Sequence, residues 1–597
     1  MKGKAHGQIR RSQVITTWGP GALLDLPRYA VIVGGLDTWP KPGDLDEIPE
    51  PRLVRKLQIM TGVESPRLYS PPAVSNDPRE THDHIGAWRF PEWFVVQDEQ
   101  TDEKRVRPRR LVHRKELDDR GRFDGRQVVP IRFVRACPKG HVDDIQWRDF
   151  VHGPDDPCRR QLWLDEKGTS GDLRDLWVRC ECGKQRGLYE ATMIEEKPLG
   201  TCSGRLPWLG PRERESCSLP SRLLTRTAAN SYFPQVISAL SIPDRMNAIQ
   251  KVVEELWEDL QYVTIAEELA FLKKKPKIAG KLAHFDDADV MKAIHEMKHG
   301  AGDDRPVKQV ELDALLAAPE GYGDDVPIDP NFHARRLPER VWRVEGIPEG
   351  IEAVIQLHRL REVLALIGFT RFEAAMPDIN GEYESDVERA RLALDPAWFP
   401  AVENRGEGIF IQLRGASVHA WRERPAVKER LDQLSAGHKK WLEKRKKDRP
   451  FPGGPYVLLH TLSHLLLQSL SMRCGYPASS IRERIYADDE RSRFGILLYT
   501  GSPDAEGTLG GLVHQARFIG AHLRNALRSG SLCSNDPICA QHTPGESMEE
   551  RWLHGAACHG CTLVAETSCE MHNDYLDRAL VVPTLVTEGA AFFGDNK

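Results

Sequence analysis

The placement of the cysteines constrains this chain more than any other feature. Eleven of the twelve lie in two windows, residues 137–217 and 533–569. In the second window Cys558 and Cys561 form a C-x-x-C pair, which puts two thiolates on one side of a tight turn. Two further thiolates from flanking segments would complete the tetrahedron that a structural zinc ion requires. The fold must therefore bring separate segments together at these cysteines.

The C-terminal pair has three further cysteines near it, more than one zinc ion needs. We predict a site made of Cys539, Cys558, Cys561 and Cys569. Cys533 competes with Cys539, but it precedes an Asn-Asp-Pro turn that we expect to carry it away. Buried free thiols or a redox C-x-x-C pair are the alternatives. The metal site is favoured because the pair lies beside further cysteines and does not end a thioredoxin-like strand.

The N-terminal window offers eight potential ligands, enough for two tetrahedral sites. They are Cys137, His141, His152, Cys158, Cys180, Cys182, Cys202 and Cys217. One partition joins the first four and leaves the last four together. A ribbon-like partition instead joins the 137–141 knuckle to the 180–182 knuckle. The sequence does not choose between them, and His152 alone is equally well a surface histidine. Closed N/S sites of this kind are structural rather than catalytic, so we expect one to three structural Zn²⁺ ions in the chain.

Bulk composition favours a reduced, cytoplasmic, multidomain protein. The 597 residues contain no apolar run of the length that crosses a membrane, and the first residues contain no apolar signal-peptide core. Thiols stay reduced in the cytoplasm, which favours metal over disulfides. A net charge of −5 does not suggest a general polyanion binder, so any nucleic-acid surface must be a local patch.

Two basic runs could supply such a patch. A phosphate-contacting role would use the following side chains: Arg105, Arg107, Arg109, Arg110, Lys439, Lys440, Lys444, Arg445, Lys446 and Lys447. The alternative is that both runs are solvated surface.

The order of patterns predicts an α+β, mixed multidomain fold. We expect a β-rich region at 1–125, a zinc-knuckle domain at 126–235, a mainly helical region at 236–400 and an α/β zinc-binding domain at 401–597. Within the third region the apolar spacing of residues 352–372 predicts an amphipathic helix. Within the fourth, the pattern predicts a strand near residue 410, a basic helix or helix pair after it and a buried helix that ends at Gly475.

Motifs for catalysis are missing from the sequence. No G-x-x-x-x-G-K-[ST] pattern occurs, so we expect no ATP hydrolysis through a P-loop. His460 and His464 share a helix face, but Thr461 stands where a metalloprotease has its glutamate, and we interpret the pair as core or interface histidines. Asp504 and Glu506 could be catalytic acids, although no nuclease-like lysine follows them.

Several segments along the chain resemble one known family in matching order. These are RRSQVITTWGPGALLDLP, RACPKGH, PWLG, NSYFPQ, HTLSHLL, CGYPASSIRERIY, YTGSPDAEGTLGGL and HGAACHGCTLVAETSCE. Together they resemble the DrmB family, the helicase-associated subunit of the DISARM anti-phage system. The C-terminal part also resembles the zinc-binding domain of some superfamily 2 helicases. That resemblance places the zinc ligands on Cys539, Cys558, Cys561 and Cys569.

The resemblance implies a non-catalytic subunit that forms a heterodimer with a DrmA-like superfamily 2 helicase and engages phage DNA. Two other functions stay open from the residues alone. One is a metal-dependent nuclease that uses Asp504, Glu506 or the His460–His464 pair, and the other is a pure protein scaffold.

Overall fold

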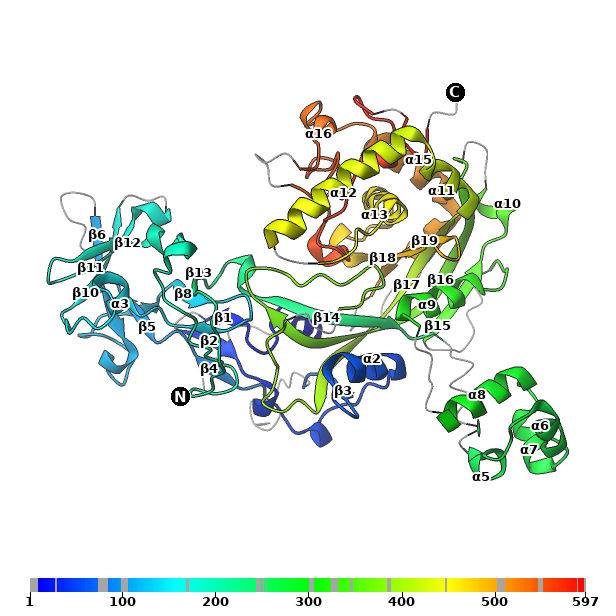
Figure 1. The fold of residues 1–597 in the computed structure, drawn as a ribbon, viewed down its shortest axis with the longest axis horizontal. Helices are drawn as coiled ribbons and strands as arrows, with labels where there is room; N and C mark the ends of the chain where they lie inside the picture. The colour runs from blue at the N-terminus through cyan, green and yellow to red at the C-terminus, as the bar shows by residue number, and fades with distance from the viewer. Residues whose placement is uncertain are drawn as a thin grey trace. The chain divides into compact units, whose positions relative to one another are not determined.

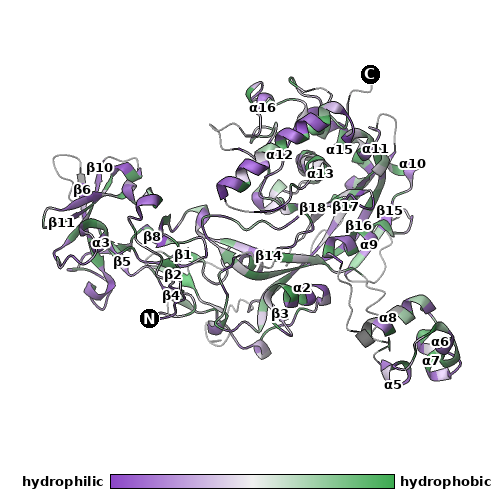
Figure 2. Ribbon diagram, in the orientation of Figure 1, coloured by the Kyte–Doolittle hydropathy of each residue, from purple (hydrophilic) through white to green (hydrophobic). Residues whose placement is uncertain are grey.

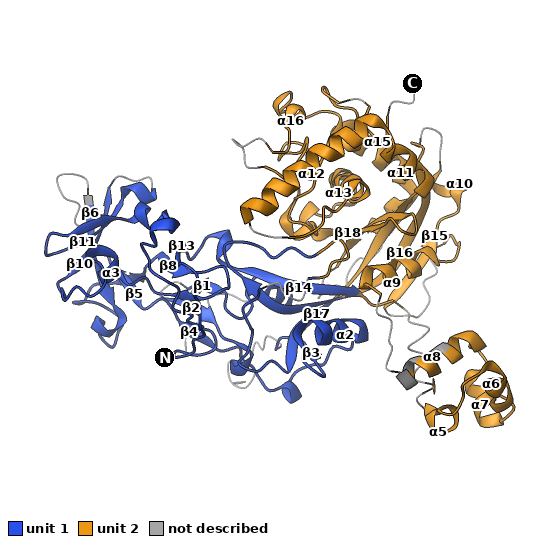
Figure 3. Ribbon diagram, in the orientation of Figure 1, with its two compact units in different colours: residues 1–239, 363–377, 383–403 blue, residues 240–362, 378–382, 404–597 orange. Residues whose placement is uncertain are grey.

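The computed structural model divides into two compact units (Figure 3). Unit 1 comprises residues 1–239, 363–377 and 383–403, and unit 2 comprises residues 240–362, 378–382 and 404–597. The structure describes residues 9–26, 29–72, 84–97, 106–167, 171–242, 249, 252–253, 255–299, 305–323, 331–343, 347–383, 388–445, 448–501, 511–545, 551–587 and 589–594. Helices and sheets occur in both units, which confirms the predicted mixed fold class. The boundaries of the four predicted regions stay predictions.

Unit 1 is built mainly from short antiparallel strands in small sheets (Figure 1). The first sheet has the order β1 (Leu23–Asp25), β2 (Ala30–Val33), β4 (Ala87–Arg89). The second has the order β12 (Gln185–Gly187), β11 (Leu176–Cys180), β10 (Leu162–Lys167), β6 (Val106–His113), β5 (Trp93–Val96), β7 (Val128–Pro130). The third has the order β13 (Arg222–Thr225), β8 (Phe133–Ala136), β9 (Val142–Asp143). Alternation of apolar and polar residues predicts strands in two segments between residues 86 and 136, where β4, β5, β7 and β8 are found.

Unit 1 also contains elements outside these three sheets. They are α1 (Arg11–Thr16), α2 (Pro51–Thr61), β3 (Arg67–Tyr69), α3 (Trp147–His152) and β14 (Phe233–Leu240). Trp147 and Phe150 of α3 are buried in one apolar core with residues of the second sheet, such as Leu164 and Val178. This packing fixes the C-terminal end of α3 beside β11 and β12.

Unit 2 is organised around α13 (Gly454–Cys474), a helix whose residues are almost all buried. It packs against strands β18 (Ile481–Asp488) and β19 (Arg493–Thr500) and helices α14 (Gly511–Gln515) and α15 (Ile519–Gly530). Gly475 ends α13 in the left-handed conformation, with φ of 73°, which confirms the predicted helix and its stop. Figure 1 shows α13 end-on among these elements.

Other elements of unit 2 also follow the sequence pattern. The chain forms α11 (Gly415–Arg422) and then α12 (Pro425–Arg445), the predicted basic helix, which is largely hydrophilic in Figure 2. Four helices share an apolar core of their own with residues that include Val253 and Ile294. These helices are α5 (Trp257–Leu260), α6 (Ala266–Leu272), α7 (Pro276–Leu282) and α8 (Asp287–His299). Unit 2 also contains helices α9 (Val307–Leu316), α10 (Glu339–Trp342) and α16 (Ile538–Gln541).

The predicted helix at residues 352–372 is wrong. The segment forms β16 (Ile351–Thr370), a strand of 20 residues that pairs with β15 (Phe332–Arg336). Nearly every residue of β16 is buried, so both faces of the strand are covered. A strand buried on both faces loses the apolar–polar alternation, so its sequence cannot be told from a buried helix by period.

Strand β17 (Trp398–Leu413) confirms the strand predicted near residue 410. It pairs antiparallel with β19, and β19 pairs antiparallel with β18. None of the helices in the described part of the chain is long and apolar enough to span a bilayer.

Candidate metal centres

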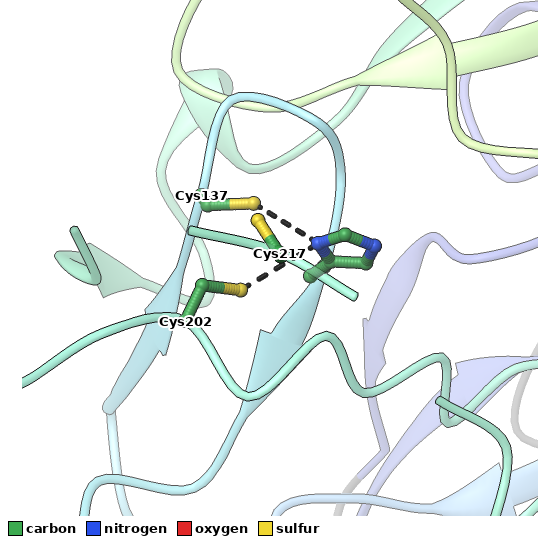
Figure 4. Close-up of side chains that lie close together, drawn as sticks. Cys137, Cys202 and Cys217 are labelled. Carbon is green, nitrogen blue, oxygen red and sulfur yellow. Dashed lines mark hydrogen bonds between the residues drawn. The ribbon is translucent and has the colours of Figure 1, made fainter. Parts of the chain in front are cut away.

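The first site joins two chain segments of unit 1. Cys137 follows β8 and His141 precedes β9, so the β8–β9 turn carries two ligands, and the loop from residue 199 to 220 brings Cys202 and Cys217 to them. The His141 Nδ1 atom lies 3.2 Å from Cys137 Sγ and 3.5 Å from Cys202 Sγ. Figure 4 shows the three sulfurs gathered beside the imidazole ring. We call this set site 1.

The outer face of His141 is oriented by a carboxylate. Its Nε2 atom lies 2.6 Å from Glu215 Oε1, and the other oxygen of Glu215 accepts a hydrogen bond from Arg391 at 3.1 Å. A carboxylate on the distal nitrogen fixes the tautomer whose Nδ1 lone pair faces the thiols, as in carboxylate–histidine–zinc triads. A hydrogen bond from the Cys137 thiol lowers the pKa of Cys202 to about 4 despite its burial. Site 1 therefore presents a thiolate and an imidazole lone pair to a common point.

The second site lies where α3 meets β11. His152 ends α3 and its Nδ1–H donates to the Arg148 carbonyl at 3.0 Å, so that Nε2 points at Cys182 Sγ, 3.3 Å away. Cys158 Sγ lies 3.7 Å from Cys180 Sγ. A hydrogen bond from the backbone N–H of Lys184 lowers the pKa of Cys182 to about 6. These four residues form site 2.

The third site is made by four cysteines of unit 2. Cys533 Sγ lies 3.4 Å from Cys558 Sγ, and Cys561 Sγ lies 3.7 Å from both Cys539 Sγ and Cys558 Sγ. The C-x-x-C turn places the Gly560 N–H 3.3 Å from Cys558 Sγ. A hydrogen bond from Cys539 lowers the pKa of Cys561 to about 5. We call this set site 3.

The spacing of the ligand atoms fits tetrahedral zinc. With Zn–S bonds of about 2.3 Å, neighbouring sulfurs of a tetrahedron lie about 3.8 Å apart. The observed separations of 3.4–3.7 Å in sites 2 and 3 match that edge, and all twelve cysteines are free thiols. Each site supplies four protein ligands, which completes a tetrahedron and leaves no position open for a substrate.

The ligand set predicted for the C-terminal site is corrected at one position. Cys533 belongs to site 3 and Cys569 does not. The Asn-Asp-Pro turn does not carry Cys533 away: it folds back, with the Asn535 N–H 3.4 Å from Cys533 Sγ, and leads directly into α16, which holds Cys539. Cys569 lies instead with His460, His464 and Glu483, and the last three of these residues are buried.

Neither N-terminal partition considered from the sequence is the one observed. The 137–141 knuckle joins the 202 and 217 cysteines, and the 180–182 knuckle joins His152 and Cys158. The reason lies in the sheets, since β13 pairs with β8 while α3 packs on β11 and β12. These long-range pairings decide which knuckles meet, and ligand spacing along the chain does not contain them.

The residues proposed for catalysis by a nuclease are not assembled by the described structure. Asp504 and Glu506 lie outside the described residues. His460 and His464 are fully buried, so a nucleic-acid substrate has no access to them.

Comparison with known proteins places the chain in a family. A model for a domain of unknown function, DUF8724, matches residues 10–233, and the model of the MrfA Zn-binding domain matches residues 462–562. The DISARM protein DrmB of Bacillus paralicheniformis (strain ATCC 9945a / NCIMB 11709 / CD-2) is 32% identical over 492 residues, which cover 78% of this chain and 83% of that protein. The chain belongs to the DISARM DrmB family. This confirms the resemblance seen in the sequence motifs.

The family comparison agrees with the geometry of site 3. The match to the MrfA Zn-binding domain contains Cys533, Cys539, Cys558 and Cys561, and it ends before Cys569. The C-terminal four-cysteine group of this DrmB-family chain thus fits a zinc site both in its distances and in the domain that contains it.

The two basic runs of this DrmB-family chain differ in how far their side chains are exposed. On β6, Arg109 pairs with Glu166 at 2.7 Å and Arg110 with Asp124 at 3.3 Å, while Arg107 is exposed. Arg105 lies outside the described residues.

The second basic run covers the C-terminal half of α12. Lys439, Lys440, Lys444 and Arg445 are all exposed there. Lys440 donates to the Gly545 carbonyl at 2.9 Å, and Lys444 lies over the Trp552 ring. Lys446 and Lys447 lie outside the described residues. The end of α12 is therefore the stronger positive surface of the two.

Proposed function

We propose that this chain is a non-catalytic, zinc-stabilised subunit of an anti-phage defence complex. In that complex it pairs with a DrmA-like superfamily 2 helicase and helps it to engage phage DNA. The observation that carries the proposal is membership of the DISARM DrmB family over most of the chain.

The metal sites support an accessory role. Sites 1, 2 and 3 each offer four protein ligands at tetrahedral spacing, and we propose that each holds one Zn²⁺. Such an ion would cross-link chain segments far apart in sequence, for example residues 137–141 with residues 202–217. Because the unfolded chain has no preformed site, the binding free energy of the ion becomes folding free energy. The sequence also lacks a P-loop, so ATP-driven movement would come from the partner.

The DNA contact is proposed for the C-terminal half of α12. Four cationic side chains lie within seven residues there, and all are exposed. Phosphate contacts of this kind give sequence-independent affinity that weakens steeply with salt. The arginines of β6 are the weaker candidates because Arg109 and Arg110 are only partly exposed.

Co-expression of this chain with a DrmA-like helicase tests whether the two proteins pair. The tagged chain is expected to retain the helicase through size-exclusion chromatography at a fixed ratio. Cys558→Ser, which removes a ligand of site 3, is expected to reduce both zinc content and soluble yield. A helicase that elutes apart from the folded, zinc-loaded wild-type chain would refute the pairing.

Neutralising variants test the DNA surface in the assembled complex. Lys439→Gln with Arg445→Gln should lower the slope of log affinity against log salt by about 2, since each lost phosphate contact contributes about 0.9. Lys274→Gln with Lys277→Gln removes the same charge from two exposed positions, one in the turn between α6 and α7 and one on α7, and should leave the slope unchanged. An unchanged slope in the first variant removes α12 from the DNA contact, and a chain that never crosslinks to DNA in the complex is a protein scaffold.

A further inference from the structure

The cluster that contains Cys569 has the composition of a metal site. His460 and His464 lie one turn apart on α13, Glu483 lies on β18, and Cys569 follows the short 3₁₀ turn Glu566–Ser568. Their ligand atoms all lie within 4.8 Å of one another. His460, His464 and Glu483 have no more than 2% of their surface exposed.

The distances within the cluster match a common centre. Glu483 Oε1 lies 3.0 Å from His460 Nε2 and 3.3 Å from His464 Nε2, and His460 Nε2 lies 3.1 Å from Cys569 Sγ. With metal–nitrogen and metal–oxygen bonds of about 2.0–2.1 Å, the edge of a tetrahedron is about 3.4 Å. The Nε2 atoms of both imidazoles therefore point at one carboxylate oxygen, at the ligand–ligand distance expected when all three atoms bind one metal ion.

The hydrogen bond on the far side of His464 shows which of its nitrogens carries a lone pair. His464 Nδ1 lies 2.8 Å from the Thr562 carbonyl oxygen. A carbonyl only accepts, so Nδ1 holds the proton and Nε2 of the neutral ring is unprotonated. That lone pair then faces the Glu483 oxygen, and two acceptors that face each other in a buried site need a cation between them. A carbonyl on the distal nitrogen is also how metal-bound histidines are usually oriented.

Hydrogen bonds also orient Cys569 and Glu483. Cys569 Sγ accepts from the backbone N–H groups of Asn573 at 3.1 Å and Met571 at 3.4 Å, as thiolates do in zinc knuckles. The Ser463 hydroxyl donates to the second oxygen of Glu483, which leaves Oε1 directed at the histidines. A divalent ion bound by one thiolate, one carboxylate and two neutral imidazoles has zero net charge, which suits a site without water.

We propose that His460, His464, Glu483 and Cys569 form a fourth structural site for a divalent transition metal, with Zn²⁺ the expected ion. Two imidazoles, a thiolate and a carboxylate oxygen are all zinc ligands, and the set is closed by four protein groups. The site would bind α13 to β18 and to the segment that follows site 3. This proposal is independent of the proposed function, since a metal here says nothing about the helicase or DNA.

Metal content of the purified full-length chain tests the site. Cys569→Ser should lower the zinc content by one equivalent relative to wild type, and Glu483→Gln should weaken retention of that same equivalent against a chelator. Cys474→Ser is the matched control, because Cys474 also lies in this part of unit 2 but belongs to none of the four groups, and it should lose no metal. A folded Cys569→Ser chain that keeps the full wild-type content overturns the proposal.

A second measurement on the wild-type chain keeps the proposal testable if the variants do not fold. Anomalous scattering at the zinc edge should show a peak between His464 Nε2, Glu483 and Cys569, separate from the peak at site 3. Absence of density there would mean that protonated histidines neutralise the carboxylate, and the metal site would be rejected.

Discussion

Replacing Arg371 should reveal how unit 1 holds the turn of site 1. The Arg371 side chain is fully buried, and its guanidinium donates to the carbonyls of Gly140 at 2.8 Å, Gly21 at 2.6 Å and Ser231. Gly140 lies in the turn between the two ligands Cys137 and His141. Burial lowers the pKa of Arg371 to about 10, so the group stays charged at neutral pH.

Arg371→Met keeps most of the volume but removes all three donors. A buried carbonyl left without a donor costs about 1–3 kcal/mol, and three of them cost about 3 kcal/mol at the least. Removing a buried charge returns part of its desolvation penalty, so we expect a net loss of about 3–5 kcal/mol, in the range measured when one member of a buried charged set is deleted. Folding of unit 1 would then be about 100-fold or more less favourable.

Zinc release into a chromogenic chelator along a urea series measures this loss. The expected result is a lower midpoint for the variant, with metal escaping from site 1 at urea concentrations where wild type retains it. Arg371→Lys keeps the charge, but one ammonium cannot reach three carbonyls set out for a planar fork, so it should recover only part of the loss. If Arg371→Met changed the free energy of unfolding by less than about 1 kcal/mol, the role of Arg371 in holding the turn of site 1 would be refuted.

Three further outcomes follow from single contacts. Burial raises the pKa of Asp144 to about 7, so the folded state holds a proton that the unfolded state has lost; stability should fall by up to about 4 kcal/mol as pH rises from 4 to 7. Asp144→Asn should flatten that part of the pH profile, and an identical profile would contradict the assignment. Glu215→Gln should weaken zinc affinity at site 1 by about 10–100-fold, measured by competition with a chelator, whereas Glu213→Gln should not. Glu311→Ala removes the two hydrogen bonds, of 2.7 and 2.9 Å, that the buried guanidinium of Arg484 makes to Glu311, and it should lower the free energy of unfolding in urea by about 3–5 kcal/mol. The double variant Glu311→Met with Arg484→Met should lose less stability, because it buries no uncompensated charge. Equal losses in the two variants would contradict that explanation.

The cysteine pattern predicted that metal ligands would gather, but not how they would be shared. A knuckle such as Cys137 to His141 is a local motif, and its turn is readable from Pro138 and Gly140. Which second knuckle completes the site depends on strand pairing, as when β13 aligns with β8. The spacing of the ligands along the chain does not contain this pairing between distant strands, so neither of the two partitions predicted for the N-terminal ligands is the observed one.

Two residues were missed for a different reason. Cys533 was set aside because a turn follows it, yet the turn reverses the chain and keeps the thiol beside Cys558. Glu483 lies on β18 as one of many acidic residues, and nothing local marks it as the partner of His460 and His464. The one sequence signal for this cluster is the alternation of two histidines with buried leucines on α13, and that pattern fits histidines packed in the core equally well.

Elements with a one-sided pattern or a clear stop signal are predicted by the sequence, whereas a buried strand with neither is not. Helix α12 has polar residues along its exposed face, and α13 begins at Gly454 and stops at Gly475. The sequence therefore predicts both helices. Strand β16 is buried on both faces and was mistaken for a helix. Period is lost when both faces are apolar, and only the partner strand decides the conformation.

The most direct test of the central claim is the DNA affinity of the helicase with and without this chain. Titrating a labelled duplex with the helicase alone, and then with the helicase and an equimolar amount of the zinc-loaded chain, separates the contribution of each. We expect the complex to bind at least tenfold more tightly, with a steeper salt dependence, while the chain alone neither cleaves the duplex nor hydrolyses ATP. Equal affinity with and without the chain, or DNA cleavage by the chain alone, would contradict an accessory subunit that acts on DNA through its partner.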